Sequence, residues 1–359
     1  MLPQNCWKLR VGFISDDFSN GRSLSRMCGP FNLMMKEDPR LEIHLLSTKS
    51  QPTWHMFGAM DVCYFLDPWM DEDVRCVAEA KAQGCRVWCD YIDNLLNVPP
   101  SNPVFKAYME KDRVRANMKT ILSQADVVTA TVPTLADIYK DVMGKDAVVR
   151  VLPESCLWPQ CPVPRKRCIS WRGLGSHNAD LESVLPQLHE ISRMPQYSKW
   201  DWLFIGEPSW RIYETIPPDR LISVPFQSPQ FFMNTWGTYG PFIHIVPLLD
   251  NPFNRGKTPL VWLEATAIGA MVIARNLPEW RDCKGIHLYD TPEGFGMLLR
   301  AAMDDYVTPP LDRAGTPIPE RFHRSAIDSR EDVYPAKTTK VVNKLRWEIL
   351  EELWAKGKK

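Results

Sequence analysis

The chain has 359 residues, of which 45% are hydrophobic and 24% charged, and its formal net charge is zero. This length exceeds one ordinary compact core and the composition is that of a folded protein, so two globular domains with little disorder are expected. A neutral chain has no overall positive field to draw it to nucleic acid, although a local basic groove stays open.

The apolar runs, the N-terminus and the cysteines give no sign of a membrane-spanning, secreted or metal-binding protein. No apolar run reaches the roughly 20 residues that span a bilayer, and residues 1–10 contain no apolar core of a signal peptide. The ten cysteines include no Cys-x-x-Cys pair, and the closest spacings, Cys85/Cys89 and Cys156/Cys161, have no His-rich neighbour. We therefore expect reduced thiols, no metal site, no transmembrane segment, a cytoplasmic location and no protein partner.

Short apolar runs alternate with amphipathic segments through the first half of the chain. Strands are expected at 9–14, 41–47, 61–66, 85–89 and 126–131, and helices at 23–36, 71–84 and 114–123. Parallel strands need crossover connections, so this order predicts a parallel sheet with helices on both faces.

The same pattern returns after a proline-rich linker at 153–166. Strands are expected at 168–171, 202–205, 242–247 and 271–274, and helices at 180–193, 259–268, 294–305 and 338–354. The predicted fold class is therefore α/β. We expect a Rossmann-like domain over 1–155, a second over 156–335, and a C-terminal helix over 336–359 that could cross back to the first domain.

The most informative stretch is 247–265, where a strand, a polar loop and a helix that starts near Pro259 follow one another. The loop places Arg255 and Lys257 beside exposed helix N–H groups, and cations at a helix N-terminus suit a diphosphate. Glu264, further along the helix, could accept hydrogen bonds from ribose hydroxyls. The alternative is a solvated loop with ordinary surface charges.

Residues 254–258 (Asn-Arg-Gly-Lys-Thr), 263–265 (Leu-Glu-Ala) and 268–274 resemble the donor-binding signature of GT-B glycosyltransferases, especially those of family 4. The resemblance implies the GT-B fold, in which two Rossmann-like domains face each other across a cleft. It implies that the first domain binds the acceptor and the second binds a nucleotide sugar. The donor-binding residues that it implies here are Asn254, Arg255, Lys257, Thr258 and Glu264.

One position departs from the pattern of family 4. Those enzymes often carry two glutamates eight positions apart, but position 256, eight before Glu264, is glycine, so that Asn254 or a backbone amide would contact the donor sugar instead. The resemblance implies a UDP-sugar as the favoured donor, no cofactor, and a retaining, metal-independent reaction. The missing glutamate favours one alternative, a non-catalytic nucleotide- or glycan-binding module. A sugar-nucleotide epimerase on the same fold is a further alternative.

A glycine turn follows the strand expected at 168–171, where strand-to-helix switches of α/β proteins bind ligands. Gly173, Gly175 and Ser176 could bring backbone N–H groups to a phosphate, and His177 could add a further donor. The alternative is an ordinary glycine turn with a capping residue, because Gly-x-Gly alone is a weak signal.

The loop after the first strand carries Asp16, Asp17, Gly21 and Arg22. Loops at the carboxyl ends of parallel strands face the ligand crevice, so these residues could contact the donor sugar or the acceptor. A capped loop before a helix is the alternative.

Asp90 and Asp93 lie at the end of the strand expected at 85–89 and are the candidates for a general base. Such a base removes the proton of the acceptor hydroxyl, while Arg255 and Lys257 stabilise the leaving diphosphate. A helix cap and a solvated acid are the alternative. The expected function is sugar transfer to an acceptor hydroxyl, on a surface glycan or on a hydroxymethylated base in DNA, as in viral DNA glucosyltransferases.

Overall fold

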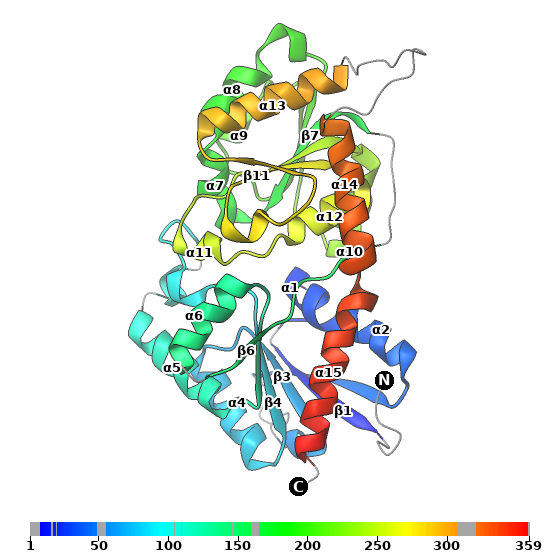
Figure 1. Cartoon of the computed structure of the whole chain (residues 1–359). Coiled ribbons are helices and arrows are strands. Elements are labelled where there is room, and N and C mark those ends of the chain that lie inside the picture. The colour runs from blue at the N-terminus through cyan, green and yellow to red at the C-terminus, as the bar shows by residue number, and fades with distance from the viewer. Residues whose placement is uncertain are drawn as a thin grey trace.

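The computed structural model describes residues 8–15, 17–18, 20–48, 55–103, 105–108, 110–144, 147–158, 165–307 and 321–357. Their helices and strands form two α/β domains that lie one above the other along the molecule, each built on a six-stranded sheet (Figure 1). The α/β class and the two Rossmann-like domains expected from the sequence are confirmed.

The first sheet has the strand order β2-β1-β3-β4-β5-β6, and all its pairings are parallel. The strands are β1 (Leu9–Ile14), β2 (Leu41–Leu46), β3 (Val62–Leu66), β4 (Arg86–Tyr91), β5 (Val127–Ala130) and β6 (Val149–Val151). The helices of this part are α1 (Gly21–Ser23), the π turn η1 (Leu24–Cys28), α2 (Gly29–Glu37), α4 (Asp71–Ala82), α5 (Lys111–Gln124) and α6 (Pro133–Met143). Crossover helices cover both faces, which is why the central strands are almost continuously apolar.

The second sheet has the order β12-β11-β10-β7-β8-β9 and is also parallel throughout. The strands are β7 (Lys166–Gly173), β8 (Asp201–Gly206), β9 (Leu221–Val224), β10 (Pro241–Val246), β11 (Met271–Arg275) and β12 (Ile286–Tyr289). The helices are α7 (Asn178–Glu182), α8 (Leu185–Ser192), α9 (Ile212–Thr215), α10 (Pro229–Tyr239), α11 (Pro252–Arg255), α12 (Leu260–Ile268), α13 (Pro292–Val307) and α14 (Arg321–Ala336). Short 3-10 turns are η2 (Phe57–Ala59), η3 (Leu95–Asn97), η4 (Phe105–Tyr108), η5 (Gly175–His177), η6 (Pro195–Tyr197) and η7 (Pro278–Trp280).

The last helix, α15 (Thr339–Gly357), packs on the first domain rather than on the second (Figure 1). Its Trp347, Leu350 and Leu353 are buried in the same apolar cluster as Phe13 and Phe31. The opposite face of the first sheet is covered by α4, α5 and α6. The predicted crossing of the C-terminal helix back to the first domain is therefore confirmed.

Two segments that connect the domains pair with each other. The backbone N–H of Cys156 donates to the carbonyl of Lys337 at 2.8 Å, and that of Thr339 donates to the carbonyl of Cys156 at 3.2 Å. The hydroxyls of Ser155 and Thr339 lie 3.1 Å apart. We call residues 155–156 and 337–339 the connector, because both passages of the chain between the domains run through it.

The chain order reverses once in each sheet, between β1 and β3 and between β7 and β10. Ligands of open parallel sheets bind outside the carboxyl ends of the strands beside such a reversal, because the neighbouring loops diverge there. The loops after β1 and after β7 line one common cavity. The fold therefore brings both favoured binding positions together between the domains.

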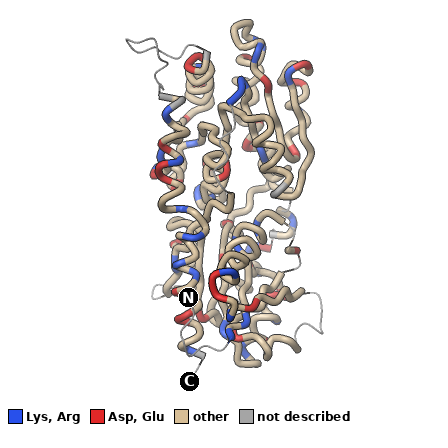
Figure 2. Tube along the Cα trace, turned by 90° about the vertical axis from the view of Figure 1, so that its right-hand side faces the viewer, with Lys and Arg blue, Asp and Glu red and all other residues tan. Residues whose placement is uncertain are grey.

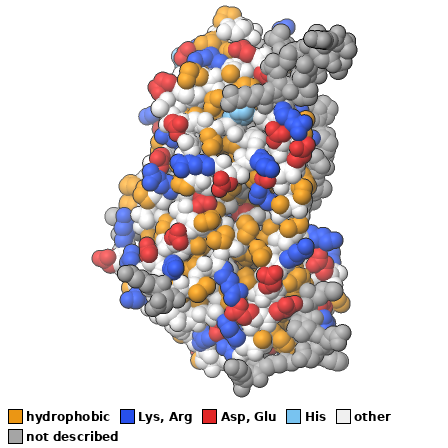
Figure 3. All heavy atoms as spheres, viewed as in Figure 1, with side chains coloured by type: hydrophobic (Ala, Val, Ile, Leu, Met, Phe, Trp, Pro, Cys, Tyr) orange, Lys and Arg blue, Asp and Glu red, His pale blue; other side chains and the backbone are white. Residues whose placement is uncertain are grey.

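Charged residues of both signs are interspersed over both domains (Figures 2 and 3). These views show no surface where basic residues alone gather. Within the part of the chain that the structure describes, no helix is long and apolar enough to cross a bilayer.

A buried ion pair lies beneath the π turn of the first domain. The guanidinium of Arg26 donates from Nε and Nη2 to the two oxygens of Asp90, each at 2.8 Å, and both side chains are 0% exposed. Thr129 and Tyr64 also donate hydroxyl hydrogen bonds to Asp90. Removing one partner of such a pair leaves an uncompensated charge in the core.

We therefore expect Asp90→Ala to lower the free energy of unfolding by about 3–5 kcal/mol, measured by urea denaturation. Glu72→Ala, which removes an exposed ion pair with Arg75, is the control and should cost about 1 kcal/mol or less. An Asp90→Ala variant as stable as the control would contradict the structural role of this pair.

Candidate active site

A cavity of about 620 Å³ lies between the domains and is lined from both. Its walls come from the loops that follow β1 and β4 in the first domain and β7, β8, β9 and β10 in the second. The predicted site residues that line it are Asp17, Gly21, Arg22, Asp93, Gly173, Ser176, His177, Lys257, Thr258 and Glu264. The fold thus gathers residues that lie up to 247 positions apart, from Asp17 to Glu264, around one space.

Lys257 is a cation in the part of the cavity wall that the second domain forms. Its Nζ lies 2.6 Å from Oδ1 of Asp93 in the other domain and 4.5 Å from the centroid of the Phe253 ring. The two charged side chains are each 19% exposed. Burial by itself would raise the pKa of Asp93, but the nearby ammonium of Lys257 holds it below its ordinary value. An anionic ligand in the cavity would compete with Asp93 for this ammonium.

Glu264 forms a second ion pair in the cavity wall, with Nη2 of Arg172 at the end of β7. Burial raises the pKa of Glu264, and Arg172 opposes that shift. The Arg172 guanidinium also lies 5.3 Å from the centroid of Phe232, and its Nε is buried without a hydrogen-bond partner among the described residues. Sequence analysis did not single out Arg172, although a basic residue between a buried strand and Gly173 is a signal for a strand-end ligand.

His244, in the middle of β10, is a further lining residue that the sequence did not indicate. It is 1% exposed, its Nδ1 lies 2.9 Å from the hydroxyl of Ser170, and its Nε2 has no partner among the described residues. Burial, with a smaller effect of Arg172, lowers the pKa of this imidazole well below its ordinary value. A neutral ring with one unpaired nitrogen can hydrogen-bond a polar ligand at the inner end of the cavity.

The glycine turn lies where the sequence predicted it, at the carboxyl end of β7. Ser176 and His177 line the cavity, whereas the N–H of Gly175 is directed to Glu207, with N and Oε2 3.1 Å apart. Next to it, Gly206 has φ +108, and a Cβ there would lie 2.0 Å from the carbonyl oxygen of Gly173. Glycine at 206 therefore allows the ends of β7 and β8 to approach each other.

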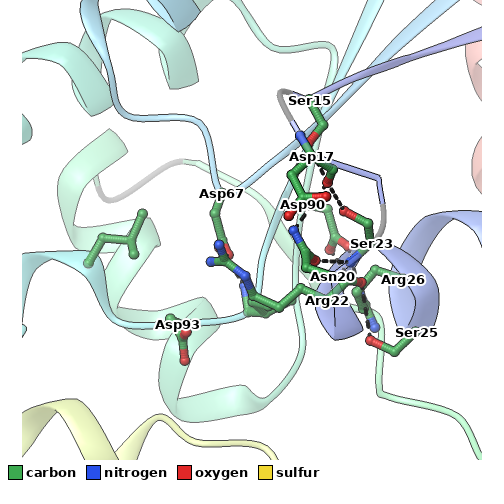
Figure 4. Close-up of polar contacts among 12 residues, drawn as sticks. Ser15, Asp17, Asn20, Arg22, Ser23, Ser25, Arg26, Asp67, Asp90 and Asp93 are labelled. Carbon is green, nitrogen blue, oxygen red and sulfur yellow. Dashed lines mark hydrogen bonds and ion pairs between the residues drawn. The ribbon is translucent and has the colours of Figure 1, made fainter. Parts of the chain in front are cut away.

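On the side of the first domain, Arg22 lines the cavity and points toward Asp67 (Figure 4). Its Nη1 lies 3.3 Å from Oδ2 of Asp67, while the side chain of Asn20 caps the helix through the N–H of Ser23 at 2.8 Å. Asp17 and Gly21 complete this wall. The prediction for Asp16 falls outside the described residues.

Besides Gly175, three predicted residues lie away from the lining. Asp90 is fully buried against Arg26 in the first domain. The exposed Arg255 pairs with Asp250, with Nε and Oδ1 2.6 Å apart. Asn254 is 2% exposed and donates from Nδ2 into the protein rather than into the cavity. These side chains already have partners, so the structure offers none of them directly to a ligand.

Asp67 is a titratable residue that sequence patterns did not reveal. It follows β3 with φ +50, is 8% exposed and accepts the N–H of Ile92 at 2.8 Å. Burial raises its pKa to about 7, against the opposing effect of Arg22. The carboxyl therefore changes charge near neutral pH beside the Arg22 side chain.

Among the residues that the structure describes, no three His, Cys, Asp or Glu side chains are grouped as a metal ion would need.

No protein-family model and no curated protein sequence matches the chain. Several solved structures are similar to the chain. A Listeria monocytogenes protein assigned as a UDP-N-acetylglucosamine 2-epimerase is 10% identical, with 97% of each chain covered and a TM-score of 0.59. A trehalose-6-phosphate structure from E. coli with bound UDP-2-fluoro glucose is 10% identical over 96% of this chain and 99% of that chain, with a TM-score of 0.61.

An alpha,alpha-trehalose-phosphate synthase (UDP-forming) from Burkholderia vietnamiensis is also 10% identical, over 96% of this chain and 100% of that chain, with a TM-score of 0.58. The chain has the GT-B fold. This confirms the architecture that the motif resemblance implied, with two domains facing across a cavity. Membership of family 4 within the GT-B enzymes stays a prediction.

The raised pKa of Asp67 gives the GT-B chain a testable pH dependence. Its folded pKa of about 7 exceeds the ordinary 3.8, so the folded protein keeps a proton that the unfolded chain loses in this window. The cost of ionising Asp67 is absent below about pH 4 and complete above about pH 7, so stability falls as pH rises between them.

Asp67→Asn should flatten the dependence of the unfolding temperature on pH in this window. Asp219→Asn is the control, because the Asp219 side chain is 77% exposed. If both variants followed the wild-type pH curve, the assignment of the titrating group to Asp67 would be wrong.

Proposed function

We propose that this protein transfers a sugar from a nucleoside-diphosphate sugar to an acceptor hydroxyl. The observation that carries the proposal is the position of Lys257, which lines the cavity between the domains and faces Asp93. Lys257 lies at the carboxyl edge of the second sheet, in the loop that follows β10 beside the reversal of strand order. A cation placed there suits an anionic leaving group, whose developing charge it would stabilise.

The second domain would hold the donor. Lys257 and Arg172 would contact the diphosphate, and Glu264, freed from Arg172 by that contact, would accept hydrogen bonds from the ribose. Thr258 and the turn at Ser176 lie on the same wall. A UDP-sugar is the proposed donor, because the names of the three GT-B neighbours each contain UDP.

The first domain would hold the acceptor, with Asp93 as the general base. When the diphosphate takes the ammonium of Lys257, the Asp93 carboxylate loses its partner and becomes available to an acceptor hydroxyl. The acceptor oxygen then bonds to the anomeric carbon, the bond from that carbon to the diphosphate breaks, and the hydroxyl proton passes to Asp93. In a retaining reaction the leaving phosphate would take this proton instead.

Asp17, Gly21 and Arg22 form the wall against which the acceptor would lie. A surface glycan and a hydroxymethylated base in DNA are the two acceptor classes proposed. Assays with a labelled donor and each acceptor distinguish them, because only the true acceptor takes up label.

A sugar-nucleotide epimerase is the second candidate function. It is favoured by the fold match to the Listeria protein assigned as such an enzyme, which covers 97% of both chains. An epimerase would convert the donor without any acceptor. A non-catalytic module would bind the donor and convert nothing.

Of the two cations in residues 254–258, we expect Lys257 to be needed for donor binding and Arg255 not to be. A nucleotide sugar at about 100 times its Kd should stabilise the protein by about 2.7 kcal/mol, seen as a rise in unfolding temperature across a panel of UDP-, GDP-, ADP- and dTDP-sugars. Lys257→Ala should weaken the best donor about tenfold or more, because it removes a charged hydrogen-bond donor.

Arg255→Ala is the matched comparison, since Arg255 lies two residues away and pairs with the exposed Asp250. It should keep the protection that the wild-type protein shows. Protection retained by Lys257→Ala, or lost equally in both variants, would contradict the proposed diphosphate site.

A further inference from the structure

Glu154 is a buried carboxyl group of the cavity wall that has no hydrogen-bond partner among the described residues. It lies at the end of the first domain, immediately before the connector, and is 4% exposed. No described residue donates a hydrogen bond to its carboxyl oxygens, and its ion pair with Arg26 is long, with Oε2 and Nη1 3.9 Å apart. Burying a polar group without a partner costs free energy, so binding of a ligand that supplies the partner is favoured.

The backbone before and after this carboxyl group is fixed on both sides. Nη1 of Arg26 donates to the carbonyl of Pro153 at 3.0 Å, and the guanidinium is itself held in the buried ion pair described above. On the other side, Sγ of Cys156 lies 3.6 Å from the carbonyl oxygen of Leu263, the residue before Glu264 on α12. The carboxyl group therefore lines the cavity close to Glu264, which reaches the same space from the second domain.

The charges around Glu154 favour an uncharged part of a ligand. Burial raises the pKa of Glu154, while Arg26 and Arg346 oppose this shift. Asp90 and Glu264 add to the shift through their negative charges. Two neighbouring carboxyl groups repel the phosphates of a nucleotide but not its hydroxyls. A hydroxyl is both a donor and an acceptor, so it can bond to a carboxyl group in either protonation state.

We propose that Glu154 binds the ribose of the donor together with Glu264, each through one of the two vicinal hydroxyls. The inference rests on the proposed function and deepens it, because it gives the first domain a part in binding the nucleoside. A deoxyribonucleotide would leave one of the two carboxyl groups without a partner. Sites that hydrogen-bond a substrate hydroxyl reject analogues that lack it for this reason. The donor class is thereby narrowed to ribonucleotide sugars.

The test measures by calorimetry the Kd of UDP-glucose and of its 2′-deoxy and 3′-deoxy derivatives, each of which lacks one ribose hydroxyl. If another sugar of the panel binds better, it and its deoxy derivatives take the place of UDP-glucose. The wild-type protein should bind each derivative about tenfold more weakly than UDP-glucose. Glu154→Leu removes both carboxyl oxygens, while Arg26 keeps its pair with Asp90. This variant should bind UDP-glucose about tenfold more weakly than the wild-type protein does.

Coupling between the substitution and the missing hydroxyl identifies the contact. Glu154→Leu should no longer distinguish UDP-glucose from the derivative that lacks the hydroxyl bound by Glu154, since both changes remove the same interaction. It should still reject the other derivative, and Glu264→Leu should show the reverse pattern. A variant distorted as a whole would instead weaken all three probes by one factor.

UDP tests whether the hydroxyl belongs to the ribose, because UDP carries the ribose but no transferred sugar. Glu154→Leu should weaken UDP by the same factor as UDP-glucose. Glu110→Leu is the control: the Glu110 side chain is 69% exposed and lies outside the cavity lining, so this variant should bind all probes as the wild-type protein does. Glu154→Met, whose unbranched side chain resembles glutamate in shape, replaces Glu154→Leu if the latter does not fold.

Unchanged affinity for UDP-glucose in the Glu154 variant, or effects that simply multiply for both derivatives, would overturn the inference and leave the proposed function intact. A loss seen with UDP-glucose but not with UDP would place the contact on the transferred sugar and overturn it too. So would a wild-type protein that binds either deoxy derivative as tightly as UDP-glucose, whatever the variants do. Failure of the wild-type protein to bind UDP-glucose and every other nucleotide sugar of the panel would instead reject the proposed function, and this inference with it.

Discussion

The ion pair between Lys257 and Asp93 joins the two domains where loops at the carboxyl edges of both sheets line a common cavity. In a parallel sheet, all the loops that follow the strands lie on one edge, and two such edges face each other here. The ammonium and the carboxylate therefore belong to opposite walls of one cavity. In the proposed reaction, a diphosphate would separate the two groups, and each would then take one of the two complementary tasks assigned to it above.

Other polar contacts between the domains accompany this pair. Nδ2 of Asn94 donates to the carbonyl of Pro252 at 2.9 Å, and the N–H of Thr134 donates to Glu279 at 2.9 Å. Both are partly buried hydrogen bonds, and such a bond contributes about 1 kcal/mol to stability. The connector, by contrast, ties both chain passages together through backbone hydrogen bonds.

The sequence predicted the centres of both sheets because their physical signals are local. Central parallel strands such as β3 and β10 are buried on both faces, and their short apolar runs are visible without a structure. Three strands were not predicted: β6, β9 and β12. Each lies at the edge of its sheet and is only partly buried, so its sequence carries a weaker apolar signal.

Site residues could be predicted where they belong to a sequence motif. They could not be predicted where the path of the backbone decides which side chain reaches the cavity. The motif gave Lys257 and Arg255 the same predicted role. The short helix α11, which Asn251 caps through the N–H of Asn254, lies just before Lys257, and of the two cations only Lys257 lines the cavity. Asp67 and His244 belong to no motif. Their relevance comes from a positive φ, from burial and from unpaired or shifted groups, which arise only in the folded chain.

A crystal structure with a UDP-sugar bound would examine the central claim most directly, through the separation of Lys257 Nζ and Asp93 Oδ1. This separation is 2.6 Å in the structure described above. The account predicts a longer separation, with the diphosphate in contact with Lys257 and the Asp93 carboxylate open to the acceptor side of the cavity. A bound diphosphate that leaves the ion pair intact, or that lies away from Lys257, would contradict it.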